Sequence, residues 1–174
     1  MILFVRHGET EYNAKGLTQG QLDIPLNENG INQAEVVKQA LKDEKIDIIY
    51  ASPLSRARQT AEIINEEHNV EIVFDDRLME FYAGIRQGED FYSWSEDRIK
   101  AFKECPESFG AESNIDFFTR VIEFFSEIED EDKNILIVSH GGVFKNIYRY
   151  LHGITDFMQK FPTPENCEVV KMKD

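Results

Sequence analysis

The sequence contains little cysteine, no long apolar run and a deficit of basic charge. Its two cysteines, Cys105 and Cys167, form no disulfide framework and fit a reducing compartment, so we expect two buried, small hydrophobic side chains. The apolar run at residues 1–5 is too short for the core of a signal peptide, and no later run reaches the roughly 18 to 20 residues of a membrane span. These absences predict a cytoplasmic protein that makes no contact with membranes.

Basic residues are outnumbered, 19 against 33 acidic ones, and the formal net charge is −14 at pH 7. Non-specific binding to nucleic acid needs a basic surface, so we expect no nucleic-acid partner. An anionic substrate would have to be attracted by a local cluster of positive groups, because the overall field opposes its approach.

Apolar stretches alternate with helical patterns along the chain. Short strands are predicted at residues 2–5, 46–51, 70–74 and 135–138, and a weaker one at 168–171. Four helices are predicted between them. They comprise a helix capped by Asn27 with Ile31, Ala34, Val37 and Leu41 on one face; a helix with Pro53 in its first turn and Leu54, Ala57, Ala61 and Ile64 on one stripe; a helix with Ile115, Phe118, Ile122, Phe125 and Ile128 on one stripe; and a helix from Gly141 to about Leu151.

This alternation predicts an α/β fold, a three-layer sandwich with a mostly parallel central sheet flanked by helices. The 174 residues suffice for a single domain, 1–174, with a substantial core. Residues 86–110 break the alternation, and we predict a short helical or irregular insertion over the site. Its aromatic residues would form either an apolar wall for a substrate or a local core, and the usual burial of such side chains favours the core. They are Phe91, Tyr92, Trp94 and Phe102.

Unusual polar residues follow the predicted strands. Arg6, His7 and Gly8 follow the first strand, and Arg56 lies shortly after the second. Glu80 lies just beyond the third strand, and His140 follows the fourth. The carboxyl ends of parallel strands lie along one edge of the sheet, where ligands bind. We therefore expect two histidines, two arginines and a glutamate to converge on one site.

This set of side chains indicates phosphoryl transfer without a metal. Arginine presents a planar fork of donors to phosphate oxygens, and glycines at a helix N-terminus, here Gly141 and Gly142, let backbone N–H groups approach an anion. A neutral imidazole is a nucleophile towards phosphorus, and a protonated carboxyl group can act as general acid. The chain has no metal-ligand spacing, no Walker loop and no Rossmann fingerprint, so we expect no cofactor and no metal.

The same residues resemble the histidine phosphatase superfamily, also called the phosphoglycerate mutase-like family. Its hallmark is a strand that ends in Arg-His-Gly-Glu-Thr, which is matched at residues 6–10. The similarity continues nearly to the end of the chain in family order. It includes Asn13, residues 19–26, Gly30, residues 33–34, 52–61, 78–80 and 110–113, Arg120, and residues 138–142.

The resemblance implies a role for each matched residue. His7 would be the nucleophile that becomes phosphohistidine, and Glu80 would protonate the leaving oxygen and then activate water. The phosphoryl oxygens would be bound by Arg6, Arg56 and His140. The remaining phosphate or substrate contacts would come from Gly8, Asn13, Thr18, Gln19, Gly20 and Gly141.

The chain departs from the family pattern at Arg86 and Gln87, where relatives often carry an aromatic residue and an acid. Arg86 would add a basic contact at the far end of the substrate, or both residues would be exposed in a loop. The short insertion favours a phosphatase of a small phosphorylated metabolite over a phosphoglycerate mutase. A non-catalytic module that binds phospho-ligands is the third alternative. Exposed aromatics in the insertion would support a homodimer.

Overall fold

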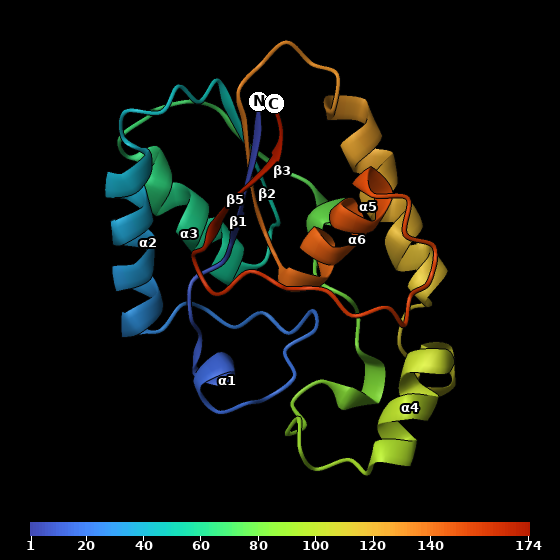
Figure 1. Cartoon of the computed structure of the whole chain (residues 1–174). Coiled ribbons are helices and arrows are strands. Elements are labelled where there is room, and N and C mark those ends of the chain that lie inside the picture. The colour runs from blue at the N-terminus through green and yellow to red at the C-terminus, as the bar shows by residue number, and fades with distance from the viewer.

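A single five-stranded sheet organises the computed structural model, which describes all 174 residues (Figure 1). The strands are β1 (Ile2–Arg6), β2 (Ile48–Ala51), β3 (Ile72–Phe74), β4 (Ile135–Ser139) and β5 (Val169–Lys173), in the order β3-β2-β4-β1-β5. The first four are mutually parallel, and β5 pairs antiparallel with β1 at one edge. The five predicted strands and the mostly parallel sheet are confirmed.

Helices cover both faces of the sheet and complete the predicted three layers. Figure 1 shows α2 (Glu28–Leu41) and α3 (Ser55–Asn65) on one face and α5 (Asn114–Ile128) and α6 (Gly141–Leu151) on the other. The short α1 (Glu11–Ala14) and α4 (Glu96–Glu104) lie beyond the carboxyl ends of the parallel strands. None of the helices combines the length and the apolar composition that crossing a bilayer requires.

Two apolar clusters hold the layers together, one on each face of the sheet. Phe4 packs into the cluster beneath α5 and α6, whereas the next residue, Val5, packs into the cluster beneath α2 and α3. Successive side chains of a strand point to opposite faces, so the continuous apolar run of β1 fills both layers. Phe4 and Val5 are fully buried, and burial of each side chain contributes about 1.5 to 3 kcal/mol.

The start of α2 is as predicted, whereas the start of α3 is not. The side chain of Asn27 accepts a hydrogen bond from the Gly30 backbone N–H at 2.8 Å and caps α2. Pro53 precedes α3, which begins at Ser55, so the prediction that it lies in the first turn is wrong. The N-cap residue, Leu54, has no side chain that can cap the helix. The Asp23 carboxylate takes this role from another segment and accepts hydrogen bonds from the Ser55 N–H (2.6 Å) and hydroxyl (2.8 Å).

Three burial predictions need correction. Ile31 on α2 is 43% exposed and Ile115 on α5 is 67% exposed, so neither faces the core. The α5 helix is apolar around much of its circumference and fits two overlapping stripes, of which packing selects one. The buried stripe consists of Phe117, Val121, Phe124, Phe125 and Ile128. Cys167 is buried as expected, but Cys105 is exposed because it caps the end of α4, away from both clusters.

The predicted insertion contains α4 and two short 3-10 helices, Gly84–Arg86 and Pro106–Phe109. Trp94 and Phe102 are buried in a small core of their own with Ala83 and Ala111, and their rings meet edge to face at 5.6 Å. The local core is therefore confirmed for these two aromatics. It is wrong for Tyr92, which is 90% exposed, and for Phe91, which lies at the edge of the site described below.

Candidate active site

A pocket of about 240 Å³ opens at the carboxyl ends of the parallel strands, and we call it the His7 pocket. Nine of the predicted site residues line it: Arg6, His7, Asn13, Thr18, Gln19, Gly20, Arg56, Glu80 and Arg86. His140 does not line it directly, but its ring lies against that of His7, with 5.2 Å between the centroids. Gly8 and Gly141 do not line the pocket; a Cβ atom at Gly8 would overlap the Gly30 backbone, and one at Gly141 would press on the Thr163 side chain.

His7 directly follows β1 and is held in one orientation. Its Nδ1 lies 2.7 Å from the Gly8 carbonyl oxygen, so Nδ1 carries the proton and donates it, which leaves Nε2 with a free lone pair. Burial, and then the charges of Arg56 and Arg6, hold the pKa of His7 well below its usual value. The imidazole is therefore neutral at neutral pH, which is the form that can act as a nucleophile.

His140, at the N-terminus of α6, is fully buried and has one hydrogen-bond partner. Its Nε2 lies 2.8 Å from the Ser52 hydroxyl, which also accepts a bond from the Leu54 N–H at 3.3 Å. The hydroxyl proton then points to Nε2, and the proton of the ring lies on Nδ1, which is buried without a partner. Burial and the Arg56 charge lower the pKa of His140 well below its usual value. His140 thus offers one unused N–H donor from a neutral ring.

Two arginines bring positive charge to the pocket without a carboxylate partner. Arg56 is fully buried and donates to the Leu22 (2.8 Å) and Gly20 (2.7 Å) carbonyls, while Arg6 donates to the Pro164 carbonyl at 2.9 Å. Burial lowers the pKa of Arg56 to about 10, so it remains charged at neutral pH. The Nε atoms of both arginines are buried without a partner, which suits them to bind an anion.

The Glu80 carboxylate is held at the other side of the pocket by backbone groups. Its oxygens accept bonds from the Phe81 N–H at 2.8 Å and from the Gly142 N–H, at the N-terminus of α6, at 3.2 Å. A Cβ atom at Gly142 would overlap this carboxylate and press on the Phe117 ring, so residue 142 has to be glycine. No lysine or arginine forms an ion pair with Glu80.

The backbone that carries Glu80 is fixed by three side chains. Arg120 donates to the carbonyls of Met79 (2.7 Å) and Glu80 (3.0 Å), and Gln21 also donates to the Glu80 carbonyl at 3.0 Å. The Ser139 hydroxyl at the end of β4 donates to the Leu78 carbonyl at 2.7 Å. A bidentate ion pair with Glu112 orients Arg120, so α5 and β4 together place Glu80.

The loop between β1 and α2 forms the remaining wall. Asn13 accepts bonds through its Oδ1 from the Thr10 N–H (3.2 Å) and hydroxyl (3.0 Å), which leaves its Nδ2 available to a ligand. The Gly8 N–H donates to the Thr60 hydroxyl at 3.1 Å, and Thr60 donates to the Arg56 carbonyl at 2.7 Å. Through Thr60, these two hydrogen bonds connect Gly8, which follows His7, to Arg56.

Arg86 and Gln87 are both partly buried rather than exposed in a loop. Gln87 accepts a bond from the Gln21 N–H at 2.8 Å and so supports the wall that contains Gly20. Arg86 lies over the rings of Trp94 and Phe102, 5.3 Å from each centroid, and makes no ion pair. Arg86 lines the His7 pocket, and its contact with the far end of a substrate stays a prediction.

Ser52, Thr60, Gln21 and Arg120 orient the site, yet sequence reasoning assigned them no role. All four stand within the stretches that resemble the family, which is the one signal that marked them. The partners through which they orient the site lie 40 to 88 positions away, so local patterns could not reveal them. No group of three or more His, Cys, Asp or Glu side chains in the structure is placed to hold a metal ion.

A neutral histidine, unpaired arginines and an opposed carboxylate define a site for phosphate monoesters. A family model described as histidine phosphatase superfamily (branch 1) matches residues 2–173. The chain belongs to this superfamily, and the expected membership is confirmed.

Similar proteins carry the names of phosphatases and of phosphoglycerate mutase-like proteins. Phosphoserine phosphatase 1 of Hydrogenobacter thermophilus is 35% identical over 166 residues, which cover 88% of this chain and 76% of the relative. Phosphoglycerate mutase-like protein 4 of Arabidopsis thaliana is 36% identical, with coverage of 84% and 69%. The crystal structure of the α-ribazole phosphatase from Shigella flexneri superimposes with a TM-score of 0.78 at 28% identity, covering 88% of this chain and 80% of that one. These relatives support a phosphoric monoester hydrolase.

Proposed function

We propose that the protein is a metal-independent phosphomonoesterase that transfers the phosphoryl group of a small metabolite to His7 and then to water. The observation that carries the proposal is the state of His7. It is a buried, neutral ring with its Nδ1 proton bound to Gly8 and its Nε2 free, in a pocket lined by Arg6, Arg56 and Glu80. The roles below are proposals that rest on this geometry.

In the first step, the lone pair of His7 Nε2 attacks phosphorus, and the bond from phosphorus to the ester oxygen breaks. Arg6, Arg56 and the Nδ1–H of His140 would hold the phosphoryl oxygens, because each has a buried donor without a partner. Phosphoryl transfer depends mainly on positioning and charge stabilisation, which fixed donors provide. A protonated Glu80 would give its proton to the leaving oxygen, so that a neutral alcohol departs.

In the second step, water attacks the phosphohistidine, and the nitrogen–phosphorus bond breaks. Glu80, now a carboxylate, takes a proton from the attacking water, and His7 returns to its neutral form. The hydrogen bond from Nδ1 to the Gly8 carbonyl persists through both steps and stabilises the positive charge that the phosphorylated ring carries. The products are inorganic phosphate and the alcohol.

Hydrolysis rather than mutase transfer is supported by the cover of the site. The insertion adds α4 as its only α-helix, and the His7 pocket adjoins a larger cavity through which water can enter. The phosphatase names of the relatives agree with this choice. The homodimer and the cytoplasmic location stay predictions.

The test is turnover of 4-nitrophenyl phosphate in the presence of EDTA. Wild-type protein should release phosphate, and His7→Ala should lose at least about a thousandfold in kcat/KM because the nucleophile is gone. His152→Ala is the matched control, since His152 is exposed and lies outside the site. Retained activity in His7→Ala would contradict the phosphohistidine mechanism. Isomerisation of 3-phosphoglycerate with 2,3-bisphosphoglycerate present, faster than hydrolysis, would identify a mutase instead.

A further inference from the structure

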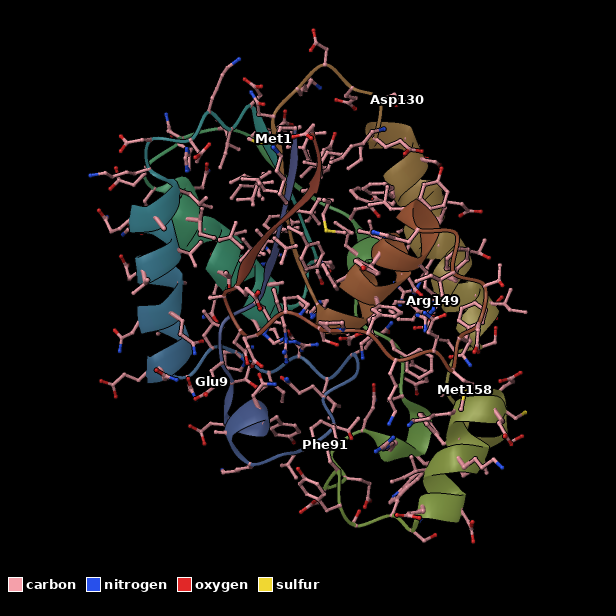
Figure 2. The ribbon with its side chains drawn as sticks, viewed as in Figure 1. Met1, Glu9, Phe91, Asp130, Arg149 and Met158 are labelled. Atoms are coloured by element: carbon pink, nitrogen blue, oxygen red, sulfur yellow. The ribbon has the colours of Figure 1, made fainter.

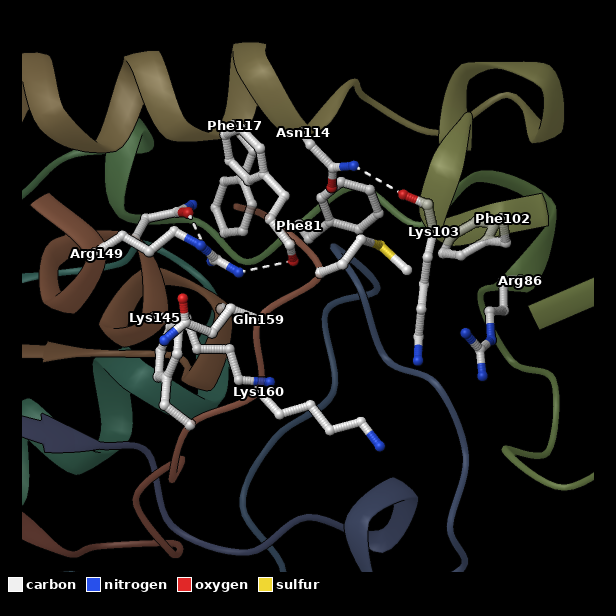
Figure 3. A pocket seen from close by; sticks show the side chains of 15 residues that line it. Phe81, Arg86, Phe102, Lys103, Asn114, Phe117, Lys145, Arg149, Gln159 and Lys160 are labelled. Carbon is white, nitrogen blue, oxygen red and sulfur yellow. Dashed lines mark hydrogen bonds between the residues drawn. The ribbon is translucent and has the colours of Figure 1, made fainter. Parts of the chain in front are cut away.

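A second, larger cavity of about 550 Å³ (Figure 3) adjoins the His7 pocket. The two share Phe81, Arg86 and Phe102 as lining residues. Gly142, whose N–H binds the Glu80 carboxylate, also lines the larger cavity. Because Glu80 faces the leaving oxygen in the proposed mechanism, the alcohol part of a substrate would extend from the His7 pocket into this cavity.

Five cationic side chains and no acidic one line the larger cavity, which we call the cationic cavity. They are Arg86, Lys103, Lys145, Arg149 and Lys160, contributed by the insertion, α4, α6 and the segment after α6. Figure 3 shows the ammonium groups of Lys103 and Lys160 directed towards one open space, with the Arg86 guanidinium beside it. Figure 2 places Arg149 and Met158, another lining residue, on the α6 side of the molecule, far from Asp130.

None of these five cations forms an ion pair, which is unusual in a chain with a net charge of −14. Nine of the 19 lysines and arginines pair with a carboxylate within 4.0 Å. Of the ten others, seven line the His7 pocket or the cationic cavity. Unpaired positive charge therefore gathers at these two places, as the sequence required of a protein that attracts an anion.

Buried donors in the cationic cavity also lack partners. Arg149 is 7% exposed and donates to the Phe157 carbonyl at 2.8 Å, but its Nε has no partner. The Nδ2 of Asn146, a residue only 2% exposed, is buried without a partner as well. Burial lowers the pKa values of Lys145 and Arg149, and the charges of Glu80 and Asp156, which form no ion pair with them, offset this effect only in part. Arg149 and Asn146 both line the cavity, so an anion bound there would lie beside polar groups whose hydrogen-bonding capacity the protein leaves unfilled.

Between the cations, the cavity presents aromatic rings. Phe81, Phe102, Phe117, Phe157 and Phe161 line it, and the Arg149 guanidinium lies over the rings of Phe157 (5.2 Å) and Phe161 (5.0 Å). The cavity therefore offers aromatic surface for an apolar part of a ligand and cations for an anionic group on the same ligand.

We propose that the cationic cavity binds a second anionic group, a carboxylate or a phosphate, carried on the alcohol part of the substrate. The preferred substrate is then a phosphate monoester whose alcohol part carries both apolar surface and a second anionic group. This inference rests on the proposed function for the position of the scissile phosphate. The cavity, its unpaired cations and its donors without partners are features of the structure and do not depend on the proposed function.

Three aryl esters test the proposal: phenyl phosphate, 4-carboxyphenyl phosphate and 4-(phosphonomethyl)phenyl phosphate. The readout is the kcat/KM of each anionic ester divided by that of phenyl phosphate for the same protein, so a general loss of turnover cancels. In Lys103→Gln/Lys160→Gln, whose altered side chains are both exposed, the quotient should fall about fivefold to tenfold from its wild-type value. A larger fall for the carboxylate or for the phosphonate ester identifies the preferred anion.

The matched control is Lys100→Gln/Lys171→Gln, which removes two charges whose side chains form surface ion pairs with Glu104 and Asp174. Its quotient should equal that of the wild type. An unchanged quotient in the cavity variant, or an equal fall in the control, would overturn the proposal.

Calorimetric titration with benzylphosphonate and 4-carboxybenzylphosphonate provides a readout without turnover. The wild type should bind the carboxylated compound more tightly, and the cavity variant should lose this preference. A protein that shows this pattern but hydrolyses no ester would contradict the phosphohistidine mechanism while supporting the anion site. Equal affinities for the two compounds in the wild type would overturn the anion site.

Discussion

The His7 pocket and the cationic cavity lie side by side but are built differently. Arg56 lines the His7 pocket and His140 lies against the His7 ring; both are fully buried, and each is hydrogen-bonded to another segment. In the cationic cavity, Lys103 and Lys160 are exposed and make no ion pair. The difference indicates a division of labour, in which rigid strand ends perform the chemistry and adaptable side chains recognise the rest of the substrate.

The largest expected effect, after that of His7→Ala, comes from Glu80→Gln. The amide keeps the shape of the side chain but cannot transfer a proton, so kcat/KM for an alkyl phosphate should fall about a hundredfold or more. The loss should be smaller for 4-nitrophenyl phosphate, whose leaving oxygen needs little protonation. Steady-state kinetics on both esters measure the difference, with Glu123→Gln on the exposed face of α5 as control. Equal losses for the two esters would remove Glu80 from the role of general acid.

A smaller effect is expected from Ser52→Ala. This change removes the hydroxyl that sets the tautomer of His140, so kcat/KM should fall about tenfold for every ester alike. Ser126→Ala, on the exposed surface of α5, is the control. If kcat/KM fell only for esters with a second anionic group, Ser52 would act on the cationic cavity, and the separation of the two sites would be contradicted.

The last prediction concerns the pH dependence of stability rather than a rate. Because the pKa values of His7 and His140 lie well below the usual value of 6.5, the folded protein does not take up protons that the unfolded chain binds below that pH. The free energy of unfolding should therefore fall as the pH drops below about 6.5, by about 1 kcal/mol per histidine for each pH unit. Urea titrations at pH 7.5 and 5.5 measure this loss, and His7→Asn should reduce it by about half. A stability that is equal at both pH values would contradict the burial of neutral histidines.

Much of the His7 pocket could be predicted because its residues follow the strands, His7 and His140 directly and Arg56 and Glu80 within a few positions. A parallel sheet places His7, Arg56, Glu80 and His140 along one edge whatever the details of packing, so four positions followed from strand order alone. The side chains that orient them could not be found in this way. Ser52 and Arg120 act on partners 88 and 40 to 43 positions away, and no local pattern records such contacts.

The cationic cavity could not be predicted, for a different reason. Phe157, Lys160 and Phe161 lie in a segment without helix or strand, which has no hydrophobic period to show which side chains share a face. The stripe on α5 had the opposite problem, since too many apolar positions allowed two faces, and Ile115 proved to be exposed. Only packing against the sheet and α6 decided between them.

The most direct test of the account is to trap the phosphoenzyme. Wild-type protein mixed with a radiolabelled phosphate monoester is quenched within milliseconds, digested and mapped by mass spectrometry. We expect an acid-labile, alkali-stable label on the peptide that carries His7, and no label in His7→Ala. Continued hydrolysis with no label on His7, or with the label on another residue, would contradict the phosphohistidine mechanism.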